Sequence, residues 1–133
     1  LIFIFAFAYY FGFIPIGEYG PKAELRFAFD LESLPSSVKI IGHGGESWTD
    51  YLFVADIRIS PDQFPELLQG RDFEPYQHYP ETIEESWIRN FQPLHTAESW
   101  EWPANDDDDS FVARCSIHTN ADRTRVFVRY VSD

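Results

Sequence analysis

The chain begins with sixteen residues that carry no charge, from Leu1 to Ile16, and this run limits the possible structures more than any other feature. A helix rises about 1.5 Å per residue, so the run would span roughly 24 Å of the roughly 30 Å hydrocarbon core of a bilayer. Because the chain has no Met and starts at Leu1, we expect a processed product or fragment, in which upstream residues complete the span. The composition predicts a membrane anchor over residues 1–16.

Two other interpretations of residues 1–16 stay open. Ala6 and Ala8 have the spacing of small residues before a signal-peptide cleavage site, which predicts a signal remnant. The Phe and Tyr residues of the run also favour strands, which predicts buried strands of the domain itself. For an anchor, the first basic residue after the run is Lys22, and this scarcity of positive charge favours an extracytoplasmic location in the cell envelope.

The charge of the chain excludes one class of partner. The sequence has 10 Lys and Arg against 22 Asp and Glu, a net charge of −12, so a nucleic-acid backbone would be repelled. The hydrophobic fraction of 44%, with 13 Phe, 7 Tyr and 4 Trp, is too high for a disordered acidic tail. Residues 23–133 are therefore expected to fold as a single domain without nucleic-acid partners.

Alternating apolar and polar residues predict most of the regular structure. Odd-numbered positions from Ala23 to Leu31 are apolar, which is typical of a strand with one buried face. The last two alternating runs flank a short turn, which predicts a terminal hairpin. The predicted strands cover residues 23–31, 38–41, 50–60, 111–118 and 125–131.

Two capping boxes predict helices. The first pairs Ser60 with Gln63, just before an apolar stripe that ends near Gly70. The second pairs Thr82 with Glu85, and Ile83, Trp87 and Phe91 follow at four-residue spacing on one buried face. Together with the strands, they predict an α+β fold, an antiparallel sheet of about five strands with two helices on one face.

Three tryptophans are the candidate binding residues. Trp48, Trp100 and Trp102 lie in or beside predicted loops, where exposed rings can stack on sugars or contact a protein partner. The alternative is that these rings cap a small hydrophobic core. The binding interpretation favours a non-enzymatic interaction domain whose ligand is an unidentified envelope component.

A small hydrolase is the alternative function. His43 or His118 could act as a general base beside a carboxylate, if the fold brings these side chains together in a pocket. No serine lies in a G-x-S-x-G motif, and no histidine has metal-ligand spacing. The sequence therefore predicts no catalytic residue, no metal site and no cofactor.

Three other features are expected to be structural. Residues 42–45, Gly-His-Gly-Gly, predict a flexible hairpin connection. The four aspartates at residues 106–109 predict a solvated acidic loop, because the pattern lacks the glycine and the last acidic ligand of an EF-hand. The only cysteine, Cys115, alternates with apolar residues, which predicts a buried and inert thiol.

Several short elements resemble small, uncharacterised bacterial envelope proteins. They are the apolar N-terminus, Leu-Pro-Ser at residues 34–36, the strand that begins at Asp50, and Pro-Asp-Gln-Phe at residues 61–64. The resemblance implies a membrane-anchored location and this fold class, and it supplies no catalytic residues. We expect a membrane-tethered or exported binding domain, and a subunit of a membrane assembly is a further interpretation of the same features.

Overall fold

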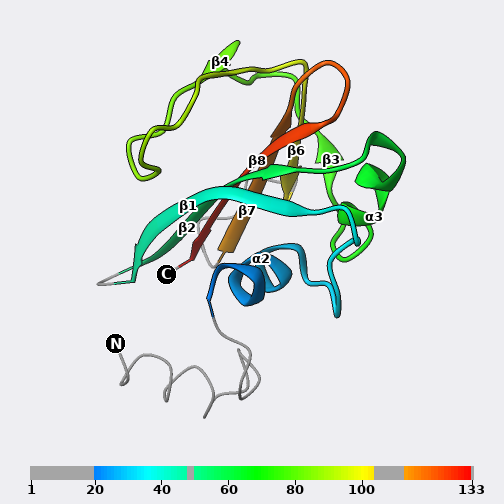
Figure 1. The fold of residues 1–133 in the computed structure, drawn as a ribbon. Helices are drawn as coiled ribbons and strands as arrows, with labels where there is room; N and C mark the ends of the chain where they lie inside the picture. Colours follow the sequence, from blue (N-terminus) through cyan, green and yellow to red (C-terminus); the bar gives the residue numbers. More distant parts are fainter. Residues whose placement is uncertain (1–19, 48–49, 104–112, 133) are drawn as a thin grey trace.

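The computed structural model describes residues 20–47, 50–103 and 113–132, and it shows a mixed α+β domain (Figure 1). A six-stranded antiparallel sheet has the strand order β1-β2-β8-β7-β6-β3, and β4 pairs with β5 in a second small sheet. The predicted class and the antiparallel sheet are confirmed, with six strands in place of about five. Residues 1–16, Trp48 and residues 106–109 lie outside the described residues.

Hairpins connect β1 to β2 and β7 to β8, and β8 pairs with β2 in the centre of the sheet. The terminal hairpin predicted from the sequence is therefore confirmed for its described residues. The elements are α2 (Pro21–Phe29), β1 (Lys39–Ser47), β2 (Tyr51–Arg58), the 3-10 turn η1 (Pro61–Gln63), α3 (Phe64–Leu67), β3 (Glu74–Pro75), β4 (Thr82–Ile83), β5 (Leu94–His95), β6 (Glu98–Trp102), β7 (Ala113–Thr119) and β8 (Arg125–Ser132).

One face of the sheet packs against both helices. Leu25 and Phe29 of α2, together with Phe64 and Leu67 of α3, are fully buried in the same apolar cluster as Cys115 of β7. Alternate residues of the central strands supply the rest of this cluster, as the two-residue period of a strand requires. The burial predicted for Cys115 is confirmed. Over the described residues, neither helix has the length and apolar character needed to cross a bilayer.

The opposite face of the sheet is covered by a largely irregular segment. Residues 76–97, here called the arm, connect β3 to β6 and carry β4 and β5. Figure 1 shows the arm on the side of the sheet that faces away from α2. A second apolar cluster lies between the arm and the sheet, and it consists of Val54, Ile83, Ile88, Leu94 and Phe127.

The strand predicted for residues 23–31 is wrong, because this segment forms helix α2. Its buried residues Leu25, Ala28 and Phe29 also fit helical spacing. Arg71 then donates to the carbonyls of Phe27 and Ala28, at 2.8 Å each, near the end of the helix. The apolar pattern of residues 23–31 is therefore compatible with both a strand and a helix. Arg71, which is distant in sequence, supplies hydrogen bonds to carbonyls that the helix end leaves without a partner.

The two predicted helices have different outcomes. The one near residue 60 forms as η1 and α3, but Ser60 makes no capping bond. Gln63 instead accepts hydrogen bonds from the backbone and hydroxyl of Ser37, at 2.9 and 2.5 Å. The helix predicted over residues 82–91 is wrong, since β4 and turns occupy this part of the arm.

Candidate functional site

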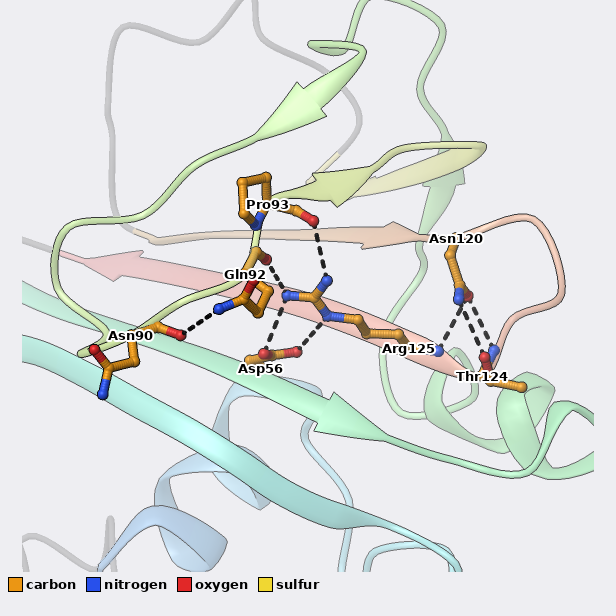
Figure 2. A network of polar contacts seen from close by, with 7 residues as sticks. All are labelled: Asp56, Asn90, Gln92, Pro93, Asn120, Thr124 and Arg125. Carbon is orange, nitrogen blue, oxygen red and sulfur yellow. Dashed lines mark hydrogen bonds and ion pairs between the residues drawn. The ribbon is translucent and has the colours of Figure 1, made fainter.

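A buried arginine fixes the arm to the sheet (Figure 2). Nε and Nη2 of Arg125 donate to the two carboxylate oxygens of Asp56, at 3.0 and 3.2 Å. Nη1 donates to the carbonyl of Pro93 at 3.2 Å, and Nη2 also donates to the carbonyl of Gln92. The Arg125 and Asp56 side chains are only 10% and 7% exposed. At this depth each charge needs its partner, because a buried charge without one destabilises the fold. The arm carbonyls take up the remaining donors of Arg125.

Glycines on β1 let the arm approach the edge of the sheet. A Cβ atom at Gly44 would lie 2.0 Å from the carbonyl oxygen of Trp87, and one at Gly42 would lie 2.6 Å from Cγ2 of Ile88. No side chain fits at these distances, so the backbone of the arm rests directly on the backbone of β1. The flexible turn predicted for residues 42–45 is therefore wrong, because these residues are part of β1.

Trp87 has a fixed backbone and an exposed side chain. Its N–H donates to Oε1 of Glu85 at 3.2 Å, and Oε2 of Glu85 pairs with Arg129 of β8 at 3.4 Å. Its carbonyl lies against Gly44, yet the residue is 44% exposed. Trp87 was expected on the buried face of a helix, and only the docking of the arm shows that its ring faces solvent.

A second exposed apolar residue lies near this contact. Ile41 is 49% exposed and occupies a bulge, where the register of β1 on β2 shifts between Ile40 and Gly42. Its neighbour Gly42 contacts Ile88, the residue after Trp87. Among the described residues, Ile41, Trp87 and Tyr76 are the only exposed large apolar side chains, and Tyr76 lies at the opposite edge of the sheet, directly after β3.

These residues define the candidate site. We use the name β1 edge surface for the outer edge of β1, Ile41 and the ring of Trp87. None of the nine residues of β1 is buried, whereas five of the eight residues of β2 are. The surface combines strand backbone that no other described residue pairs with and two apolar side chains, which is chemistry suited to binding a polypeptide.

The tryptophans predicted from the sequence lie elsewhere. Trp100 and Trp102 are on β6, so their expected placement in loops is wrong. Trp100 is 8% exposed, and its ring centre lies 5.1 Å from that of Phe64 in the core. Trp102 is half-buried, with the guanidinium of Arg71 4.2 Å from its ring centre. A binding role for Trp48, Trp100 and Trp102 stays a prediction, and the burial of Trp100 leaves little ring surface for a ligand.

The two histidines of the alternative hydrolase are not brought together. His43 of β1 is paired with Ala55, whose side chain packs toward the helices, and it lies near Glu24 of α2. His118 of β7 is paired with Phe127, which packs under the arm. Strands β2 and β8 separate them, and they face opposite sides of the sheet.

Each histidine has its own polar neighbour. Nδ1 of His118 lies 2.6 Å from the hydroxyl of Ser99, and burial lowers the pKa of His118 to about 4. The ring is therefore neutral at pH 7, and it shares a hydrogen bond with the serine hydroxyl. On the helix side, the polar neighbour of His43 is Glu24. The hydroxyl of Tyr51 donates to Glu24 at 2.9 Å, and burial raises the pKa of Glu24. Over the described residues, no group of three acidic, histidine or cysteine side chains is arranged to hold a metal ion.

Comparison of the chain with known proteins found no matching family model, no matching curated protein and no matching solved structure. The resemblance to bacterial envelope proteins therefore stays a prediction, and the functional argument rests on the geometry of the chain itself.

Proposed function

We propose that this domain is a non-enzymatic binding module that holds a protein partner on the β1 edge surface. The observation that supports this proposal is the arrangement of Trp87, a residue that is 44% exposed although its backbone is fixed by Glu85 and Gly44. Tryptophan is among the residues that contribute most to binding energy at protein interfaces. A ring on a backbone that is already ordered loses less conformational entropy on binding than one on a mobile loop.

The charge of the chain indicates which partners are favoured. With a net charge of −12, the domain attracts a basic partner over long distances and repels a second copy of itself. The partner is therefore a protein segment with net positive charge and an apolar side chain for Trp87.

The location of the domain is a second part of the proposal. The uncharged composition of residues 1–16 supports a membrane tether, with the binding domain in the cell envelope. Fractionation of cells that express the full reading frame with a C-terminal reporter, combined with protease treatment of spheroplasts, tests this part. Membrane-bound and protease-accessible protein is expected, and soluble, protected protein would contradict it.

Site-specific crosslinking tests the binding surface. Benzoylphenylalanine is placed at position 87, or at position 76 as the matched control, because Tyr76 is also an exposed aromatic residue, 37% exposed, at the other edge. Irradiation of living cells should give a discrete adduct from position 87 only, and Ile41→Ala should weaken it at least fivefold. Equal adducts from both positions, or none from position 87, would overturn the proposal.

A further inference from the structure

We infer that the partner of the β1 edge surface is an extended, basic polypeptide segment, which adds to the sheet as a new strand beside β1. This inference rests on the proposed function and names the class of its ligand. It follows from the backbone of β1, which offers a row of hydrogen-bond donors and acceptors at the end of the strand order.

The outer edge of β1 has no partner in the part of the chain that the structure describes. Within residues 20–47, 50–103 and 113–132, its register joins it only to β2, and no other backbone hydrogen bond involves residues 39–47. Because alternate residues of an antiparallel strand direct their N–H and C=O groups to opposite sides, half of these groups face away from β2. An added strand would satisfy them with main-chain hydrogen bonds.

The two edges of the sheet differ in how they are protected. The opposite edge is β3, which has two residues, and one of them is Pro75. Short length and proline are both means by which proteins block the pairing of an edge strand. On β1 the protective features are the bulge at Ile41 and two charged residues, Lys39 near its start and Glu46 near its end. The stretch over residues 42–46, about 17 Å long at ~3.4 Å per residue, is open to a partner.

The side chains next to this stretch indicate what the added strand carries. Gly42 and Gly44 leave the arm side of β1 without side chains at these two positions, where Trp87 lies beside the strand, and the next residue on that side is Glu46. A residue of the added strand on that side can therefore reach the indole ring and favours an apolar side chain. The net charge of −12 favours lysine or arginine among the other residues and disfavours pairing with the β1 of a second copy.

Synthetic peptides test strand addition directly. The probe is a nine-residue peptide in which valine alternates with lysine, and a second peptide has glutamate for lysine. Two further probes carry N-methyl groups on the backbone of either the odd or the even residues. Binding to the domain is measured by fluorescence anisotropy, and amide hydrogen exchange of residues 42–46 is followed by NMR.

Strand addition predicts a specific pattern among these probes. The lysine peptide should bind at least tenfold more tightly than the glutamate peptide and slow exchange at residues 42–46. Only one of the two N-methylated isomers should lose binding, because only alternate amides of an added strand face β1. Trp87→Ala should weaken binding at least fivefold, whereas Tyr76→Ala should leave it unchanged.

The other outcomes separate the inference from the proposed function. If both N-methylated isomers bind as well as the parent and Trp87→Ala still weakens binding, the binding surface stands and strand addition is wrong. Strand addition is also wrong if no probe binds, or if binding leaves amide exchange at residues 42–46 unchanged. In that case the crosslinking experiment at position 87 tests the proposed function separately. A dimer with residues 42–46 already protected would identify a second copy as the occupant and overturn the inference.

Discussion

Arg125 of β8 and Asp56 of β2 form a buried bidentate ion pair, with N–O distances of 3.0 and 3.2 Å, across two central strands of the sheet. The same guanidinium donates to the carbonyls of Gln92 and Pro93 in the arm. One side chain therefore connects the sheet to the segment that covers its second face. Because the arm also positions Trp87, this ion pair lies at the base of the proposed binding surface.

Replacing this arginine should destabilise the domain strongly. Arg125→Met leaves the carboxylate of Asp56 buried without a partner and removes the donors of two arm carbonyls. Loss of one member of a buried pair typically costs about 3–5 kcal/mol in the free energy of unfolding. Urea unfolding followed by circular dichroism measures this quantity.

The matched control is Arg123→Met. Arg123 pairs with Glu98 at 2.8 Å, but the two side chains are 37% and 40% exposed. A pair of this exposure contributes about 1 kcal/mol or less. Equal losses in the two variants would show that the Arg125 pair does not stabilise the arm as described.

A single methyl group at Gly44 should release the arm. Gly44→Ala places Cβ 2.0 Å from the carbonyl oxygen of Trp87, and because Cβ is attached directly to the backbone of β1, the two backbones must move apart. Overpacking of this kind typically costs about 1–3 kcal/mol. Trypsin cleavage after Arg89, an exposed arm residue, should become at least fivefold faster while the helix-side core stays folded. His43→Ala, an exposed neighbour on β1, should leave the cleavage rate unchanged.

Acid should destabilise the domain through His118. Burial lowers its pKa from 6.5 to about 4 on folding, so the unfolded chain binds more protons between these values. The contribution of His118 to stability is complete above pH 6.5 and is lost as the pH falls toward 4. The free energy of unfolding should fall by about 2–3 kcal/mol from pH 7.5 to 4.5 because of this residue.

Two variants distinguish the pH dependence caused by His118 from that caused by the Asp and Glu carboxylates. His118→Gln should remove about 2–3 kcal/mol of the pH dependence, measured by urea unfolding at both pH values. His78→Gln, at an exposed arm position, should keep the full dependence. Parallel pH profiles of wild type and His118→Gln would contradict the burial of the neutral ring.

The thiol of Cys115 should react only after unfolding. Cys115 is fully buried in the helix-side core, and burial raises its pKa to about 12. Ellman's reagent needs both access and a thiolate, so the native protein should stay unmodified for hours. In concentrated urea one thiol per chain should react within minutes. Rapid reaction of native protein would show that this part of the core opens readily.

Local sequence patterns determined much of the sheet. The alternating runs near residues 50–60 and 125–131 became β2 and β8, because long runs of period two with β-branched and aromatic residues fit few other structures. The burial of Cys115 followed from the same alternation. The charge of the chain, and with it the preferred sign of a partner, is likewise a property of composition alone.

The tertiary structure decided where short patterns were ambiguous. Residues 23–31 fit a strand and a helix equally well, and Arg71, bonded to the carbonyls of Phe27 and Ala28, is among the contacts that favour α2. The glycines at residues 42–45 are typical of a turn in isolation. In the folded chain they pair with β2 as part of β1, and Gly42 and Gly44 let the arm pack against the strand.

The candidate site is the feature that depends most on tertiary contacts. Nothing next to Trp87 in the sequence shows that its ring is exposed, because this depends on Gly44 of β1 and on Arg129 of β8, which pairs with Glu85. The sequence therefore determined the central strands, whose burial pattern is local. The arm and the open edge of β1 depend on contacts between distant residues, and only the folded chain brings these together.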